Sequence, residues 1–430
     1  MRNLFALTFL LSVSIGFGQN KNELDSLQKN NSSELKQQPG LALAASKIFF
    51  SEKKYSISGF GEFNYVPSQG MVDKNMGDLE LYYSGLYRFA TFFGYRITDK
   101  LIWNSEVQFE YIHYKQEEAH LEFVFEAFVD FLYRDYLKAR IGFYPLTIGY
   151  VNNNDEPIMF HSVNRSEVER LIIPSTWIEL GVMFYGNISN DWSYALGFSQ
   201  GLNSEHFLSP TWIRQGREIR FDAPKSISVN PQINYTGFKN VTLSLSGYYG
   251  ESGQGATVIE DATKTKIKGN ISLTSAYAKY QKDNFSFVGV GTYGQLADTE
   301  KIYQQTLSAT GNGQVLGKEV YGYLFEFGCD VLPYLKKSKI RKENENFFFN
   351  ANEQKLTLFT RYERLNTHFN IETVLENLPK SVNDLSIWTF GVNYNTKENI
   401  VLKADYQHRT NVVLQDQINH IYEVGLGFIF

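Results

Sequence analysis

Apolar and polar residues alternate with a period of two along most of the chain beyond Tyr55. In residues 78–97 the odd positions from Leu79 to Ile97 are largely apolar, whereas the even positions include Glu80 and Arg88. This alternation predicts β-strands with one apolar and one polar face. The pattern recurs, and we predict sixteen strands at 55–65, 78–97, 101–114, 119–133, 137–144, 177–188, 192–200, 226–236, 241–250, 271–281, 285–294, 320–332, 355–365, 385–394, 400–409 and 421–430.

The connections between these strands alternate in length. Short turns are expected at 98–100, 134–136, 189–191, 238–240, 282–284 and 395–399. Longer loops are expected at 66–77, 145–176, 201–225, 251–270, 295–319 and 366–384. One end of the molecule should therefore carry tight turns and the other end loops. The connection 333–354 is an exception on the turn side, and we have no physical account of its length.

Alternation alone fits either a soluble β-sandwich or a membrane barrel whose apolar face meets lipid. Three further features favour the barrel: strands of about 9–12 residues or more, aromatic residues on the apolar faces, and alternating loop lengths. A fourth is the ending "YEVGLGFIF", which puts Tyr422 and Phe430 on one face of a last strand that can pair with the first. We predict an all-β fold, a 16-stranded antiparallel transmembrane β-barrel with an inward-folded constriction loop at 145–176.

The N-terminus has the pattern of a secretory signal. Arg2 precedes the apolar run "LFALTFLLSVSIGFG", and cleavage is expected after Gly18. Residues 19–54 are polar and are expected to be a flexible or weakly helical periplasmic leader, with the barrel at 55–430. No later window has about 18 consecutive apolar residues. The expected location is the bacterial outer membrane, with outer-membrane lipid around the barrel and the assembly machinery recognising Phe430.

Three segments resemble one family of channels. They are "NNNDEPIMFHSVNRSEVERLIIPSTWIELGVMFYG" after the fifth strand, "LFTRYERLNTH" at 358–368 and "VLKADYQHRTN" at 401–411. Together with the rest of 55–430 they are similar to the phosphate-selective porin O/P superfamily, especially porins of Bacteroidetes-type bacteria. The resemblance implies a sixteen-stranded, homotrimeric channel with a loop folded into its lumen. It does not specify the solute, because this superfamily includes many barrels that are not selective for phosphate.

The polar faces would line the lumen. They carry seven basic residues: Arg88, Arg96, Lys138, Arg140, Lys279, Arg361 and Lys403. They carry thirteen acidic residues: Glu62, Glu80, Glu106, Glu110, Glu122, Glu126, Asp130, Glu179, Glu326, Asp330, Glu363, Asp405 and Glu423. A phosphate filter needs a ladder of Arg and Lys, so this wall is not an obvious one. Either acidic and basic walls face each other across a constriction, or adjacent pairs such as Glu126 with Arg140 form salt bridges that hold the barrel.

The loop 145–176 would narrow a barrel that is otherwise wide at sixteen strands. Pro157 and Pro174 bracket it, and "SVNRSEVERLI" between them predicts one short helix capped by Ser162 or Asn164. The candidate constriction residues are Asp155, Glu156, His161, Arg165, Glu167, Glu169 and Arg170. The alternative is an external loop that lies over the mouth of the barrel.

Composition limits the function classes. The formal net charge of −5 argues against nucleic acid as a partner, and the single cysteine, Cys329, excludes an intramolecular disulfide and a Cys-based metal site. No catalytic, metal or cofactor motif is recognised among the seven scattered histidines. The expected function is passive diffusion of small hydrophilic or charged solutes, with phosphate and other anions among the candidates. The alternatives are a barrel enzyme, either a phospholipase or a protease, and a non-conducting structural or adhesive barrel.

Overall fold

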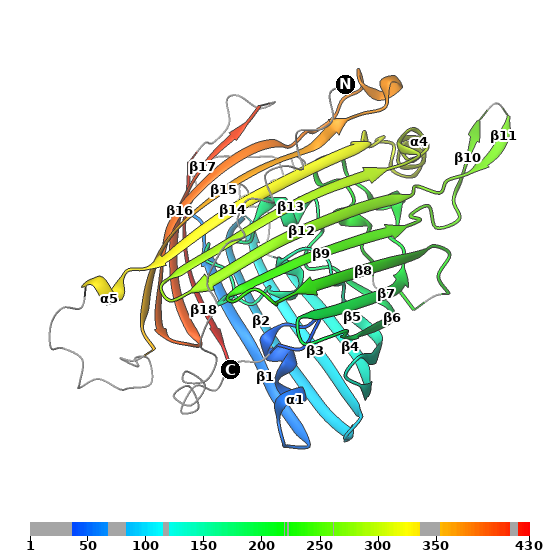
Figure 1. The fold of residues 1–430 in the computed structure, drawn as a ribbon. Coiled ribbons are helices and arrows are strands. Elements are labelled where there is room, and N and C mark those ends of the chain that lie inside the picture. The colour runs from blue at the N-terminus through cyan, green and yellow to red at the C-terminus, as the bar shows by residue number, and fades with distance from the viewer. Residues whose placement is uncertain are drawn as a thin grey trace, which may run out of the picture. The chain divides into compact units, whose positions relative to one another are not determined.

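Sixteen antiparallel strands form one closed barrel (Figure 1). The computed structural model describes residues 37–67, 83–114, 120–218, 220–221, 223–260, 262–335, 353–412 and 420–430. The barrel strands are β1 (Tyr55–Tyr65), β2 (Tyr83–Thr98), β3 (Leu101–Tyr114), β4 (His120–Arg134), β5 (Leu137–Pro145), β6 (Ile178–Asn187), β7 (Trp192–Gln200), β8 (Ile227–Tyr235), β9 (Val241–Gly250), β12 (Ile271–Lys282), β13 (Phe285–Leu296), β14 (Glu319–Asp330), β15 (Lys355–Asn370), β16 (Asp384–Lys397), β17 (Ile400–Asn411) and β18 (His420–Ile429). The predicted 16-stranded antiparallel barrel is confirmed.

The apolar face of each strand points out of the barrel. In β18, Tyr422 is 62% exposed and Val424 is 49% exposed, whereas Glu423 between them is 1% exposed. The same alternation holds in β3, where Trp103 and Val107 are exposed while Glu106 is buried. A soluble protein rarely exposes an apolar surface of this extent, but lipid requires one.

The barrel closes between its first and last strands. Phe60 of β1 lies opposite Ile429 of β18, and their pairing runs to Tyr65 opposite Val424. Gly59 and Phe430 extend the seam by exchanging backbone hydrogen bonds of 3.1 and 2.9 Å. Closure leaves no open sheet edge, which a spanning sheet needs because lipid offers no hydrogen-bond partners.

We expect this closed barrel to resist detergent. An unheated sample in SDS should migrate differently from a boiled one, because the hydrogen-bonded ring unfolds only on heating. The measurement is gel mobility with and without boiling. Identical mobility of the two samples would contradict the barrel.

The long connections hold most of the remaining elements. A hairpin of β10 (Thr257–Glu260) and β11 (Thr263–Lys266) extends away from the barrel (Figure 1). The helices are α3 (Glu167–Leu171), α4 (Thr299–Thr310) and α5 (Leu332–Leu335), with 3-10 turns η2 (Val151–Asn153), η3 (Ser204–His206), η4 (Ser209–Thr211), η5 (Arg214–Gly216) and η6 (Thr373–Leu375). The unexplained long connection at 333–354 lies mostly outside the described residues.

The described part of the expected leader contains a buried helix, α1 (Leu43–Phe50). Its sequence, LAASKIFF, combines good helix formers with apolar side chains, and Leu41 and Ile48 are fully buried. This end of the leader is therefore helical and buried, while residues 19–36 lie outside the described residues. Among the described helices, none is both long and apolar enough to cross a membrane.

Candidate functional site

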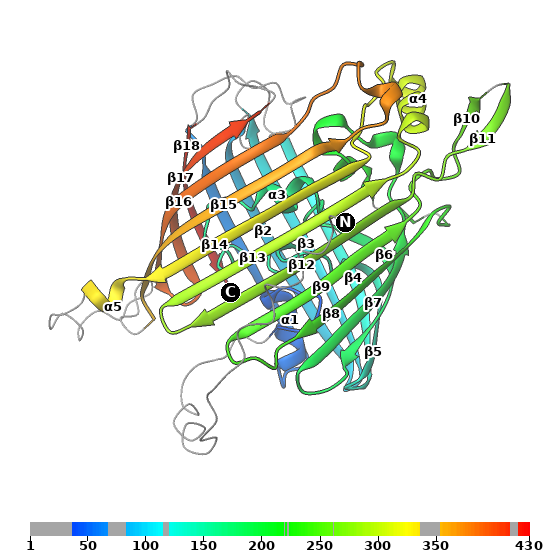
Figure 2. The ribbon, with the colours of Figure 1, turned by 45° about the horizontal axis from the view of Figure 1, so that its top comes forward.

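The connection between β5 and β6 enters the barrel and crosses it (Figure 2). The backbone N–H of Val163 donates to Asp405 of β17 at 2.6 Å, and that of Val168 donates to Glu363 of β15 at 3.2 Å. Both carboxylates project from strands far around the ring from β5 and β6. The loop therefore lies in the lumen rather than over the mouth.

The short helix expected in this loop starts later than its sequence indicates. It is α3, and its N-cap is Ser166, whose hydroxyl accepts a 3.3 Å hydrogen bond from the N–H of Glu169. The predicted caps Ser162 and Asn164 are wrong because their side chains have other partners. Ser162 donates to the carbonyl of Asn164, and Asn164 donates to Glu423 of β18 at 2.8 Å.

Two basic residues on the far wall hold the loop in place. Lys403 donates to the carbonyls of Phe160 and Ser162, both at 2.9 Å. Arg361 donates to the Ser162 hydroxyl and pairs with Glu363 at 2.7 Å. Arg361 and Lys403 are thus buried under the loop, and they do not form an open basic wall opposite the acidic strands.

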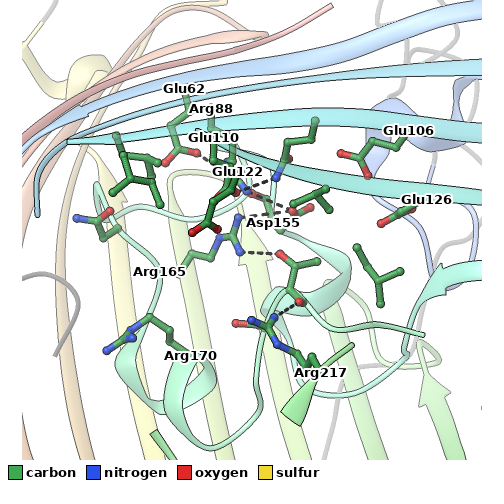
Figure 3. Close-up of a pocket in the computed structure, with 18 of the residues that line it drawn as sticks. Glu62, Arg88, Glu106, Glu110, Glu122, Glu126, Asp155, Arg165, Arg170 and Arg217 are labelled. Atoms are coloured by element: carbon green, nitrogen blue, oxygen red, sulfur yellow. Dashed lines mark hydrogen bonds and ion pairs between the residues drawn. The ribbon is translucent and has the colours of Figure 1, made fainter. Parts of the chain in front are cut away.

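A cavity of about 190 Å³ remains between the loop and the wall formed by β1–β4. Its lining includes six carboxylates and five guanidinium groups (Figure 3): Glu62, Glu106, Glu110, Glu122, Glu126, Asp155, Arg88, Arg165, Arg170, Arg214 and Arg217. The glutamates of β3 and β4 lie on one side, while Arg165, Arg170 and Arg217 approach from the other (Figure 3). The arrangement can place opposite charges on two sides of a passing solute.

Three of the seven candidate constriction residues line this cavity: Asp155, Arg165 and Arg170. Asp155 connects the loop to the wall, because Arg88 of β2 lies 3.4 Å and Arg165 lies 3.6 Å from its carboxylate. Arg88 also pairs with Glu62 of β1 at 2.6 Å. Burial raises the pKa of Asp155, and the neighbouring Arg88 opposes that shift.

The other four candidates face protein groups instead of the cavity. Glu169 accepts hydrogen bonds from the N–H groups of Tyr150 and Val151, and burial raises its pKa to about 7. Glu167 pairs with Arg170 and lies 3.5 Å from Arg409. His161 is 3.0 Å from the Ser286 hydroxyl and stacks on Phe359. Glu156 accepts from two N–H groups at the start of α1.

The predicted wall residues divide in a similar way. Register places Glu106 opposite Glu126 and Glu110 opposite Glu122 across β3 and β4, so four carboxylates gather on one patch of the cavity wall. Asp130 does not contribute to this patch. It pairs with Arg140 at 3.2 Å, and both are fully buried. The expected partner of Arg140 was Glu126, but Asp130 is its direct cross-strand neighbour. Lys138 is half-buried, with its ammonium 6.0 Å from the Tyr185 ring.

Arg214 and Arg217 were missed because charges were counted only on the strands and in the loop 145–176. Both come from the loop between β7 and β8. The arginine-rich stretch "RQGREIR" in that loop is the sequence feature that could have indicated them. Arg214 donates to the carbonyls of Arg170 and Ser175 at 3.0 and 2.6 Å, and Arg217 donates to that of Pro174 at 3.0 Å. In the described chain neither guanidinium contacts a carboxylate. Burial lowers the pKa of Arg217 to about 10, so it stays charged at neutral pH.

No protein-family model matches the chain. It is 28% identical over 402 residues to an uncharacterized protein of Aquifex aeolicus, covering 91% of this chain and 83% of that protein. Its fold is similar to that of Salmonella typhi OmpF in complex with daunomycin, with a TM-score of 0.49 at 10% identity over 87% of this chain and 96% of that one. An anion-selective porin from Comamonas acidovorans gives a TM-score of 0.47 at 10% identity, covering 87% of this chain and 99% of that one.

The structure of the chain itself defines its class. A closed antiparallel ring with an apolar outer surface and a polar interior is a transmembrane β-barrel of the bacterial outer membrane.

Proposed function

We propose that this protein is a porin, a passive diffusion channel for small hydrophilic or charged solutes. The observation that carries the proposal is the cavity of about 190 Å³ inside the barrel, lined by five wall glutamates with Arg88 and by Asp155 with four arginines of two loops. The resemblance to the phosphate-selective porin O/P superfamily supports the same class. In this proposal the loop 145–176 is the constriction, and Asp155, Arg165 and Arg170 lie at the eyelet.

The solute preference is proposed to be weak rather than specific for phosphate. A phosphate filter binds its anion through several Arg or Lys side chains free of competing carboxylates. Here six carboxylates line the same cavity as the five guanidinium groups, so a phosphate would meet no uniformly basic surface. A transverse arrangement of charge orients polar solutes without excluding either sign of ion.

Planar-bilayer recording of the purified protein tests this function. We expect stepwise currents and a small reversal potential across a KCl gradient. A strongly anion-selective reversal potential would overturn the proposed preference. The absence of currents, combined with lipase or protease activity, would favour the enzyme alternative; absence of both would favour a structural barrel.

The assembly is proposed to be a homotrimer, as the family resemblance implies. Light scattering of the detergent-solubilised protein, corrected for bound detergent, measures the protein mass per particle. A mass of one chain per particle would contradict the trimer.

A further inference from the structure

Helix α1 lies against the inner surface of the barrel at its short-turn end. It contacts β1, β2 and β3, and the wall residues that it touches include Ser58, Gly94 and Asn104. Each of these is buried, whereas its sequence neighbours Ile57, Phe93 and Trp103 are exposed on the outer face. The helix therefore occupies the lumen, close to the turn between β2 and β3.

The barrel wall binds the backbone of this helix through specific hydrogen bonds. Ser58 donates to the carbonyl of Ala44 and Asn104 donates to that of Ala45, both at 2.6 Å. Arg96 donates to the carbonyls of Ile48 and Ser51 at 2.8 and 3.0 Å. Carbonyls at the C-terminal end of a helix lack intrahelical partners, so Arg96 satisfies groups that would otherwise need water, whereas Ser58 and Asn104 bind carbonyls of the first turn.

The loop 145–176 binds the other end of the helix. The carboxylate of Glu156 accepts hydrogen bonds from the N–H groups of Leu43 and Ala44 at 3.0 and 2.6 Å. These are among the free N–H groups of the first helical turn, where a carboxylate is favourable. Burial raises the pKa of Glu156 to about 8, against the effect of these two hydrogen bonds. The helix and the loop thus form one connected obstruction.

The wall under the helix departs from the polar character of the lumen. Phe60, Phe92 and Phe128 point inward and are buried in the cluster that includes Leu41 and Ala45. Gly94 allows the helix to approach closely, because a Cβ at that position would lie 2.5 Å from the Cβ of Ile48. Inward phenylalanines suit an apolar helix face better than the wall of an open aqueous channel.

We propose that residues 37–50 are a plug that obstructs the short-turn half of the lumen, in series with the eyelet at residues 145–176. A helix with its side chains is about 10–12 Å wide, a large part of the space that a sixteen-stranded barrel encloses. The inference rests on the proposed channel function, and it assigns to the leader a role in setting conductance.

Two variants of the full-length protein test the plug by single-channel recording. Deletion of residues 37–50 removes it, and Gly94→Leu leaves no room for Ile48 and displaces it. Each is expected to raise the conductance about twofold or more, because a helix-sized obstruction leaves the path. The matched control is Gly291→Leu, since Gly291 faces outward on β13 and its Cβ would meet nothing within 4 Å.

Folding of each variant is verified by heat-dependent gel mobility. In the deletion background, Gly94→Leu should give no further increase, because the helix that it displaces is already absent. Folded variants that conduct like the wild type would overturn the plug. Currents seen only in the variants would support the plug and would show that the wild-type channel is closed by it.

Labelling of the covered wall gives a readout that does not depend on conduction. In a protein with Cys329→Ser and Ser58→Cys, the new thiol lies under α1 and should react slowly with a hydrophilic maleimide. Gly94→Leu should speed this reaction by about tenfold or more, since the covering helix leaves. If no variant conducts, the channel function fails, and an unchanged labelling rate would separately overturn the plug.

Discussion

Replacing both Arg214 and Arg217 with alanine is expected to make the channel about thirtyfold more selective for cations, since each unit charge about 4 Å from a passing ion contributes about 1 kcal/mol in water. The variant would leave six carboxylates facing three guanidinium groups around the cavity. The measurement is the reversal potential across a KCl gradient, with the wild type as reference.

Two controls separate charge from loop structure. The double lysine variant keeps both charges but loses the forked donors that hold the carbonyls of Arg170, Pro174 and Ser175, so its selectivity should stay near that of the wild type. Arg220→Ala removes a charge from the same loop. The Arg220 guanidinium is paired with Glu218 at 3.1 Å and does not line the cavity. An unchanged reversal potential in the double alanine variant would contradict the eyelet.

Asp130→Ala should be the most destabilising single change in the barrel wall. The Asp130 carboxylate accepts from Arg140 at 3.2 Å and from the Tyr185 hydroxyl at 2.5 Å, and all three side chains are fully buried. Removing the carboxylate leaves a buried guanidinium without its counter-charge, which costs about 3–5 kcal/mol. The midpoint of guanidinium chloride unfolding in detergent, followed by gel mobility or circular dichroism, measures the loss.

Glu122→Ala is the comparison, because Glu122 lies on the same face of β4, toward its other end, but is exposed, and its loss should change the midpoint little. The pair Asp130→Ala with Arg140→Met should recover most of the stability, since no unpaired charge remains. Equal midpoints for Asp130→Ala and Glu122→Ala would show that the buried pair does not stabilise the barrel.

Strand positions could be predicted from the sequence because lipid imposes a simple rule. Every second side chain must be apolar over the span of the membrane, and sixteen such runs coincide with the sixteen barrel strands. The inward direction of Glu106, Arg140 and Lys403 follows from the same rule. The position of helix α1 does not follow from this rule. The feature of the sequence that could have indicated it is the set of inward phenylalanines, Phe60, Phe92 and Phe128, which interrupt the polar faces of their strands.

The partners of the lumen charges could not be predicted in this way. The prediction paired Arg140 with Glu126, but the register between β4 and β5 places Asp130 opposite Arg140. The register of two strands cannot be read from the alternation of apolar and polar residues within each strand. Lys403 was placed on the correct face, but its partners are carbonyls of a loop more than two hundred residues earlier. Such contacts depend on how the barrel folds around the loop.

The seam between β1 and β18 also bears on how fast the barrel assembles. Phe60 and Ile429 are nearly the whole described chain apart, so this ladder has the highest sequence separation in the molecule. Contacts between residues far apart in the sequence form slowly, because the chain between them loses conformational entropy before the contact forms and stabilises the fold. Until the seam forms, β1 and β18 both present unpaired edges. Substitutions at Gly59 or Phe430 should therefore slow closure of the barrel.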